Sequence, residues 1–340
     1  MRHTVLRLSI VIVLMFTALT GCQRTDAPSA PSAPSAAPSA SPAASATTSP
    51  TASPTTSPLP TSIKFPIPPR FQWDNANGYC GETSIQSIAL YYGVWVSQQV
   101  VRDAAGSELL LDENAARALT KLKFNFESWD DSAKTPQFEK YMKWMKTRLL
   151  QGFPCITMVF LADSDLYSED YDHIVPVVGV TSRDSLLFYT LYSNRLISRP
   201  FSTLAATRDT CDSELDDGGN IPQNVDYGIA MKGLKDANGA SYPTRLRINR
   251  SDEPNVSLGE TAVNLKGTVT VSGLKPGKKY ALLRYDDLSN VPTSGDATAF
   301  LASNYDHMTS FTAETATWTF VDPVGILSSG ATYYRCVAAD

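Results

Sequence analysis

The sequence predicts an α+β domain, in which helices come first and an antiparallel sheet follows, and then a smaller all-β sandwich-like domain. Apolar residues recur at helical spacing up to about residue 150, and apolar, β-branched runs follow from residue 155. Helices followed by strands indicate an α+β order rather than alternating βαβ units. After about residue 250, short β-rich runs alternate with turn residues, which is typical of a sandwich.

Four helices are expected in the first domain. The first begins at or just after Cys80, because capping groups and an acid occupy its first turn and apolar residues follow at helical spacing: Glu82, Thr83, Ser84, Ile85, Ile88, Ala89 and Tyr92. The others are expected over residues 97–105, 113–122 and 136–150. In the last, aromatic and Met side chains lie near one face, a spacing typical of core packing.

Strands are expected where β-branched and aromatic residues gather between turn signals. Those of the first domain follow the helix-breaking Gly152-Phe153-Pro154 and cover residues 155–161, 173–180, 186–192 and 227–233. Those of the second domain cover residues 268–271, 279–285, 309–313, 317–321 and 332–337. The turn Gly273–Gly277 followed by Tyr280 resembles the corner before a strand in fibronectin type III modules. That resemblance implies binding or bracing, for example contact with a cell surface or cell wall.

The N-terminus has the features of a bacterial lipoprotein signal. Arg2 and Arg7 flank the start, and the apolar run over residues 8–19 is too short to span a bilayer comfortably. It ends in Leu19-Thr20-Gly21-Cys22, which resembles a lipobox and implies cleavage before Cys22 and lipidation of its thiol. An ordinary secretory signal is the alternative. We therefore expect export and attachment to the cell envelope by acyl chains alone, at the outer membrane if the cell has two membranes.

The segment after Cys22 is mostly Ala, Pro, Ser and Thr, which bury too little surface to offset the entropy of ordering. We expect it to be disordered, either as a stalk reaching about 100 Å or as a tether with no length requirement. The expected division of the chain is a signal peptide over residues 1–21, the lipidated Cys22 and stalk over 22–62, the α+β domain over 63–245 and the β domain over 250–340.

The charge balance narrows the classes of partner. Lys and Arg number 29 against 34 Asp and Glu, a net charge of −5. A mildly acidic chain gives no support for nucleic-acid binding or for electrostatic membrane binding. Membrane contact is therefore expected only through the N-terminal lipid.

The loop-to-helix junction at Cys80 indicates a nucleophile. A thiol at a helix N-terminus feels the positive end of the helix dipole, so we expect the pKa of Cys80 to be lowered. Gln72, eight residues earlier, offers an amide donor for a developing oxyanion. The alternative is a core cysteine, which is how we interpret Cys155 in its apolar run. Disulfide pairing among Cys155, Cys211 and Cys336 is left open.

A cysteine nucleophile needs a base, and histidine is the usual one. The chain has three histidines: His3 in the signal, His307 in the β domain and His173 in the α+β domain. His173, at the start of a strand, is therefore the candidate base.

A third residue would orient the imidazole of His173. If the strands over residues 173–180 and 186–192 form a hairpin centred between Arg183 and Asp184, His173 lies opposite Asn194. A slip of one or two residues leaves Ser193 and Tyr192 as alternatives. Asp172 would point to the other face of the strand.

These residues together resemble a papain-like cysteine peptidase. The motifs are Gln72, then Gly78-Tyr79-Cys80-Gly81 opening a helix, then Asp172-His173 leading a strand, then a polar residue after the next strand. The pattern is most similar to family thirty-nine of the cysteine peptidases, the bacteriocin-processing type and its stand-alone relatives, over roughly residues 63–235. The resemblance implies Cys80 as nucleophile, His173 as base, Asn194 as orienting residue and Gln72 as oxyanion donor.

Two departures from that family limit what carries over. The family usually has Asp where this chain has Asn194, and its bacteriocin-processing members are fused to a transporter that is not found in this sequence. The expected function is hydrolysis of peptide or amide bonds in a peptide or protein substrate, with no metal and no cofactor.

Two other functions stay open. NlpC-type cell-wall peptidases share the Cys–His chemistry and are often lipid-anchored, although their nucleophile motif differs from Tyr79-Cys80-Gly81. The other is a surface binding protein on an inactive peptidase scaffold.

Overall fold

The computed structural model describes residues 59–73, 78–106, 112–132, 134–160, 173–205, 219–235 and 239–339. The signal peptide, Cys22 and most of the expected stalk lie outside these ranges, as do Asp172 and Cys211. The chain from Ser57 to Asp340 forms one compact unit. No helix in the part described is long and apolar enough to cross a membrane.

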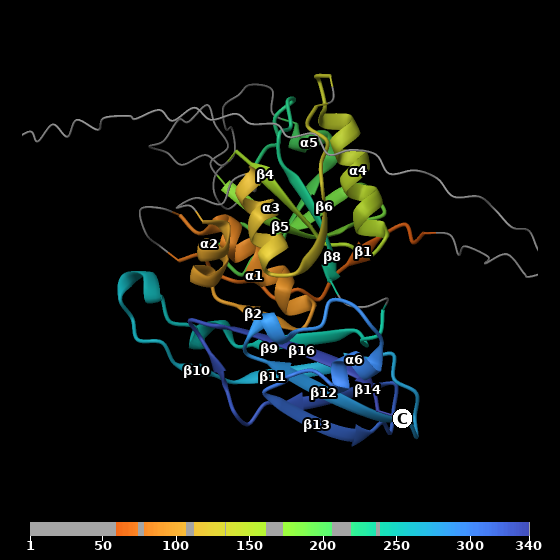
Figure 1. Cartoon of the computed structure of the whole chain (residues 1–340). Helices are drawn as coiled ribbons and strands as arrows, with labels where there is room; N and C mark the ends of the chain where they lie inside the picture. Colours follow the sequence, from red (N-terminus) through yellow and green to blue (C-terminus); the bar gives the residue numbers. More distant parts are fainter. Residues whose placement is uncertain are drawn as a thin grey trace, which may run out of the picture. The chain divides into compact units, whose positions relative to one another are not determined.

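The first half of this unit contains a seven-stranded antiparallel sheet and its helices (Figure 1). The strand order is β3-β8-β4-β5-β6-β7, with β1 paired to β5. The strands are β1 (Ile63–Lys64), β3 (Phe124–Ser128), β4 (Cys155–Val159), β5 (His173–Val180), β6 (Ser185–Phe188), β7 (Ile197–Pro200) and β8 (Gly228–Leu234). The helices are α1 (Cys80–Tyr91), α2 (Gln98–Ala105), α3 (Asp112–Lys121), α4 (Phe138–Leu150) and the short α5 (Phe201–Leu204). This is a mixed α/β arrangement, with the four expected helices in place.

Helix α1 lies at the centre of the compact unit. It contacts β5 on one side and β2 (Val94–Val96) and β9 (Thr244–Ile248) on the other (Figure 1). This double contact explains why residues 81–90 are all buried. The helical periodicity of the sequence predicts burial only for the face that carries Ile85, Ile88 and Ala89, and these side chains do enter the larger core.

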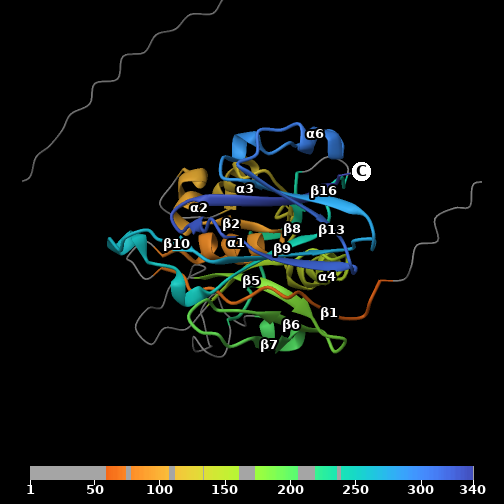
Figure 2. The ribbon, with the colours of Figure 1, turned by 90° about the horizontal axis from the view of Figure 1, so that it is seen from below.

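The C-terminal half is all-β apart from short helices. Its described strands form sheets of the orders β14-β11-β9, β13-β12-β16-β2 and β10-β15. Figure 2 views this half from below, with β9, β10, β13 and β16 labelled. Its remaining elements are β10 (Asn264–Leu265), β11 (Gly267–Ser272), β12 (Lys279–Tyr285), β13 (His307–Thr312), β14 (Thr317–Val321), β15 (Ile326–Leu327), β16 (Ala331–Ala338), α6 (Ala297–Leu301) and the 3₁₀ turns η1 (Arg250–Asp252), η2 (Val256–Leu258) and η3 (Leu288–Asn290). The expected strands of this half are present: β12 and β14 have the expected bounds, β11 and β16 are one residue longer at each end, and β13 begins two residues earlier and ends one residue earlier than expected.

The two halves interleave. Strand β2 follows α1 in the sequence, yet it pairs with β16, with Val96 opposite Ala331. Trp95 and Leu90 enter the second hydrophobic core, among residues such as Val269 and Leu282. The two regions named from the sequence therefore share a sheet and a core, and the boundaries 63–245 and 250–340 stay a prediction.

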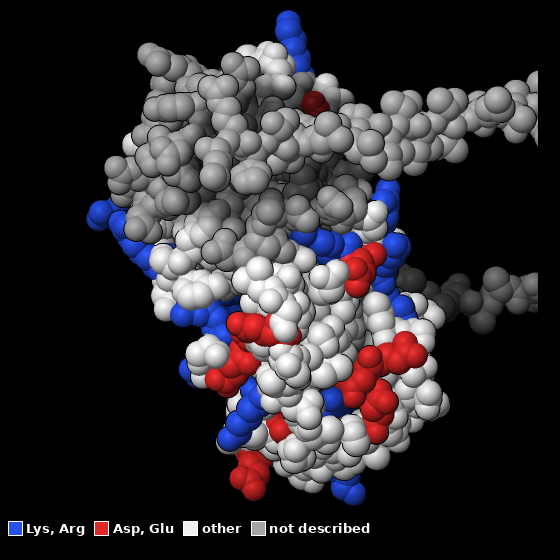
Figure 3. Space-filling view, turned by 90° about the vertical axis from the view of Figure 1, so that its left-hand side faces the viewer, with Lys and Arg blue, Asp and Glu red and all other residues white. Residues whose placement is uncertain are grey.

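The surface of the described residues shows mixed charge on the face drawn in Figure 3. Lys and Arg side chains alternate there with Asp and Glu, and no large area of one sign stands out among the residues described. A mixed surface of this kind produces no strong field that would steer a polyanion toward it.

Candidate active site

Cys80 is the first residue of α1, and its turn of helix is tied to β5. The Ser84 hydroxyl contacts the Cys80 carbonyl oxygen at 2.8 Å and the Ile174 carbonyl oxygen at 3.2 Å. Ile174 is the residue after His173 in β5. The start of α1, and with it Cys80, is therefore held beside the start of β5, where the histidine lies.

Burial controls the acidity of the Cys80 thiol. It raises the pKa to about 11, in spite of backbone N–H groups at Ile174 and Gly81 that lower it, and the nearby Glu82 carboxylate raises it further. The lowered pKa expected from the helix N-terminus is therefore wrong for this structure, because desolvation outweighs the hydrogen bonds to the sulfur. Cys80 is a neutral thiol at pH 7.

A buried ion pair contacts the two residues that directly precede Cys80. Arg102 Nε lies 2.7 Å from Glu82 Oε1, and both side chains are almost fully buried. Burial raises the pKa of Glu82, and the Arg102 guanidinium opposes that rise. The guanidinium also lies 3.5 Å from the centre of the Tyr79 ring and donates to the Gly78 carbonyl. Arg102 thus links the first turn of α1 to the two residues before Cys80.

His173 is 2% exposed, and one ring nitrogen has a defined partner. Nε2 is hydrogen-bonded to the backbone carbonyl of Thr190, so Nε2 carries the proton and Nδ1 is left as the acceptor. Burial lowers the pKa of His173 to about 4, and the Thr190 carbonyl opposes that shift. The imidazole is therefore neutral at pH 7. No hydrogen bond joins the described Cys80 and His173 side chains.

The hairpin between β5 and β6 does not have the expected register. Val180 pairs with Leu186 and Gly179 with Leu187, and an irregularity then brings Val177 opposite Phe188. The first two pairs are one residue short of the register expected for a turn centred between Arg183 and Asp184, and the irregularity shortens the register by one more residue. The residue that reaches the His173 ring is consequently Tyr192, stacked at 4.8 Å between ring centroids with planes 20° apart.

Asn194 does not reach His173, and its expected place in the site is corrected here. It is exposed, and its side-chain oxygen accepts a hydrogen bond from Arg250. The group that orients the imidazole is the Thr190 carbonyl. A backbone carbonyl leaves no residue signature, so the sequence did not indicate it, whereas Tyr192 was one of the alternatives that a shorter register allowed.

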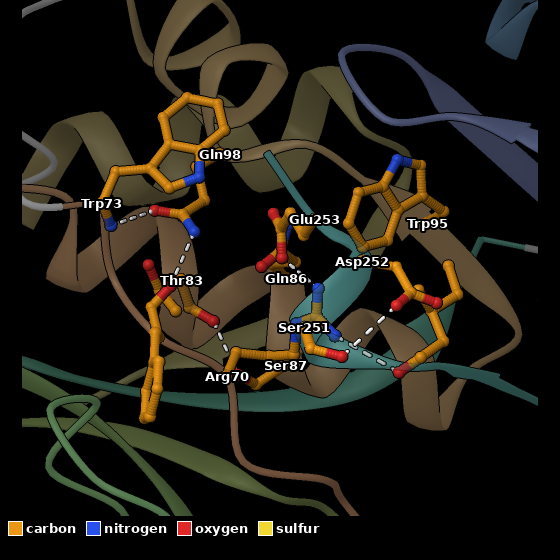
Figure 4. Close-up of polar contacts among 12 residues, drawn as sticks. Arg70, Trp73, Thr83, Gln86, Ser87, Trp95, Gln98, Ser251, Asp252 and Glu253 are labelled. Atoms are coloured by element: carbon orange, nitrogen blue, oxygen red, sulfur yellow. Dashed lines mark hydrogen bonds and ion pairs between the residues drawn. The ribbon is translucent and has the colours of Figure 1, made fainter. Parts of the chain in front are cut away.

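Gln72 lies beside the same segment. Its backbone N–H donates to the Leu191 carbonyl at 3.2 Å, one residue from the carbonyl that holds His173. Its side-chain oxygen is buried without a hydrogen-bond partner among the residues described. The segment over residues 71–73 is fixed further by Gln98, which accepts from the Trp73 N–H and donates to the Phe71 carbonyl, both at 2.9 Å (Figure 4).

The structure therefore places the segments that carry three of the four expected site residues beside one another. Cys80 comes from the N-terminus of α1, His173 from the start of β5, and Gln72 from the segment that runs beside residues 190–192. Asn194 lies outside this group.

The described residues offer two other kinds of reactive group to consider, the remaining cysteines and possible metal ligands. Cys80, Cys155 and Cys336 are free thiols, and the buried position of Cys155 confirms that it is a core residue. No group of three or more His, Cys, Asp or Glu side chains in the described ranges could hold a metal ion.

Comparison with known proteins gives a likeness to solved structures. No protein-family model matches the sequence, and no curated protein matches it. Among solved structures, the chain is similar to the peptidase domain of Streptococcus ComA, a bifunctional ABC transporter involved in a quorum-sensing pathway. The likeness has 15% identity and a TM-score of 0.33, and it covers 49% of this chain and 99% of that domain.

Proposed function

We propose that this protein is a cysteine hydrolase that cleaves peptide or amide bonds, with Cys80 as nucleophile, His173 as base and Gln72 as oxyanion donor. The observation that carries the proposal is the state of His173. Its Nε2 donates to the Thr190 carbonyl, so Nδ1 carries no proton and can accept one. The next residue, Ile174, donates its backbone N–H to the Cys80 sulfur, which places the thiol beside the start of β5.

The raised pKa of Cys80 and the lowered pKa of His173 select a mechanism without a preformed ion pair. The Cys80 thiol transfers its proton to Nδ1 of His173 as its sulfur forms a bond to the substrate carbonyl carbon. The carbonyl π electrons move to the oxygen, which accepts hydrogen bonds from the Gln72 amide and a backbone N–H at the start of α1.

Breakdown of the tetrahedral intermediate returns the proton. The C–N bond breaks as His173 protonates the leaving amine, and a thioester to Cys80 remains. Water, deprotonated by His173, then attacks the thioester, and the thiol leaves with that proton. One water is consumed, and an amine and a carboxylic acid are formed.

Location and substrate belong to the same proposal. Export and a lipid on Cys22 would place the hydrolase at the cell envelope, where its substrates would be peptide or protein chains. No nucleic acid is required, and no metal or cofactor takes part in the steps above.

A second candidate function is that of a binding protein on a peptidase-like scaffold without turnover. The observation that favours it is the pair of pKa shifts, since desolvation disfavours the thiolate and the imidazolium and so opposes charge separation between the two groups.

Covalent labelling tests the first proposal against the second. The full-length protein in detergent is incubated with a tagged peptidyl vinyl sulfone, which alkylates the cysteine of an active thiol hydrolase. We expect labelling of the wild type and of Cys155→Ala, and none of Cys80→Ala or His173→Ala. Labelling that survives in Cys80→Ala, or a wild type labelled no faster than free cysteine, would overturn the hydrolase proposal. Release of amines from a peptide library and from purified peptidoglycan then separates general peptide substrates from cell-wall substrates.

A further inference from the structure

The segment that carries Gln72 is anchored by a buried ion pair with the C-terminal half. Arg70 is fully buried, and its Nη2 pairs with Oε2 of Glu253, which follows η1. Arg70 Nη1 also donates to the Ile248 carbonyl at 3.3 Å, and its guanidinium lies 5.3 Å from the Trp95 ring centre. Figure 4 shows Arg70 among these groups, two residues before Gln72 in the sequence.

The same carboxylate has a second partner. Glu253 Oε1 accepts a hydrogen bond from Gln86 Nε2 at 2.8 Å, and Gln86 also donates to the Val96 carbonyl at 3.1 Å. Gln86 belongs to α1, the helix that begins at Cys80. One oxygen of Glu253 thus holds the Gln72 segment, and the other holds the nucleophile's helix (Figure 4).

A second contact from the C-terminal half acts on the same segment. The Arg250 guanidinium lies 3.3 Å from the centre of the Phe71 ring and donates to the Asn194 oxygen. Phe71 precedes Gln72 directly, so the two residues before Gln72, Arg70 and Phe71, both contact side chains from residues 250–253.

Electrostatics explains why such a pair is there. A buried ion pair contributes little net stability, because the desolvation of both charges offsets their attraction. It is directional, however, and breaking it leaves a buried charge without a partner. The ion pair between Arg70 and Glu253 is therefore expected to fix the position of the residue 70–72 segment rather than to add net stability.

We propose that Glu253 is a positioning residue, which sets the separation between Gln72 and Cys80 by binding Arg70 with one oxygen and Gln86 with the other. The proposal deepens the hydrolase function and rests on it for its catalytic consequence, but its structural content stands without turnover. The C-terminal half would accordingly be a working part of the active site rather than a separate binding module.

The test compares Glu253→Gln with a matched variant, Asp322→Asn, in the full chain. Asp322 is also a buried carboxylate that binds two side chains, Arg284 at 2.6 Å and the Tyr334 hydroxyl, and it accepts from the Val324 backbone N–H at 2.8 Å. It lies in the C-terminal half, away from Gln72, so the variant removes a buried charge without touching the site. Arg70→Met/Glu253→Met provides a second route if the single variant does not fold, because apolar replacement of both charges leaves none unpaired.

The first readout is amide hydrogen exchange. In Glu253→Gln, or in the double variant, we expect the N–H groups of Gln72 and Trp73 to exchange at least tenfold faster, while α4 keeps its wild-type rates. In Asp322→Asn, those two amides should be unchanged relative to α4. If the Gln72 amide exchanges at the same rate in Glu253→Gln and in Asp322→Asn, whether slowly or rapidly in both, the positioning role is overturned.

The second readout is catalysis. We expect kcat for peptide hydrolysis to fall at least tenfold in Glu253→Gln with KM within twofold, because a misplaced oxyanion donor acts on the transition state. Asp322→Asn should keep kcat within twofold. If the wild type shows no turnover above Cys80→Ala, the hydrolase proposal fails, and the exchange result still decides whether Glu253 positions the segment.

Discussion

The ring of Tyr192 lies on the ring of His173, with the two planes 20° apart and the centroids separated by 4.8 Å. Tyr192 is 46% exposed, whereas His173 is 2% exposed. One face of the imidazole is therefore separated from solvent by a single aromatic side chain at the surface. This contact helps keep His173 desolvated, which is the main cause of its lowered pKa.

Replacing Tyr192 by Ala should hydrate the imidazole. We expect the pKa of His173 to rise from about 4 toward its ordinary value of 6.5, and the free energy of unfolding to fall by about 1 kcal/mol from loss of the ring contact. Titration of the imidazole proton resonances by NMR measures the first, and urea unfolding measures the second. Tyr192→Phe keeps the ring and is the control. A pKa for His173 that does not move in Tyr192→Ala would contradict this.

The same histidine should make stability depend on pH. Its folded-state pKa lies near 4 and its unfolded-state pKa near 6.5, so the unfolded chain binds the proton first as pH falls. The neutral imidazole thus contributes stability that is present above pH 6.5 and is lost between 6.5 and 4, to a total of about 3 kcal/mol.

Glu82 acts in the opposite sense, because its raised pKa stabilises the folded state at low pH and that stability is lost as pH rises through the folded value. The contribution of His173 is therefore measured as a difference between proteins. The free energy of unfolding of the wild type should fall more steeply from pH 7 to 5 than that of His173→Gln. Parallel curves for the two proteins would refute this assignment.

The alkylation rate of Cys80 should report its raised pKa. With a pKa near 11, the thiolate fraction rises about tenfold per pH unit throughout the neutral range. We expect the rate of iodoacetamide modification at Cys80, followed by mass spectrometry of the peptide, to rise in this way from pH 7 to 9. A rate independent of pH between 5 and 8 would instead reveal a thiolate–imidazolium pair. Buried Cys155 is the internal reference.

The sequence predicted the elements around the site better than the contacts within it. The helix at Cys80 and the strand at His173 both begin where their patterns indicate, because helical periodicity and β-branched runs are local signals. The pairing of β2 with β16 is not local, and the three-residue run at Val94–Val96 gives no sign of its partner. Long-range pairing depends on which surfaces remain to be covered, which local patterns do not encode.

Two expectations about the site were wrong for physical reasons that a sequence hides. The pKa of Cys80 follows from the balance of burial against the helix N-terminus, and burial is a property of the folded chain. The partner of His173 follows from the hairpin register, which is one residue shorter than expected at Val180–Leu186, and an irregularity between Val177 and Gly179 shortens it by one more. That shift of two residues exchanges the Asn194 amide for the Thr190 backbone carbonyl as the partner of His173.

That exchange yields a prediction for Asn194. Because its side chain is exposed and bound to Arg250 rather than to His173, Asn194→Ala should change kcat less than threefold and the free energy of unfolding by less than about 1 kcal/mol. His173→Ala removes the base and should lower kcat at least 100-fold. Steady-state hydrolysis of one peptide substrate by both variants makes the comparison. A loss in Asn194→Ala that approaches the loss in His173→Ala would restore Asn194 as the orienting group and would require a different hairpin register in the working enzyme.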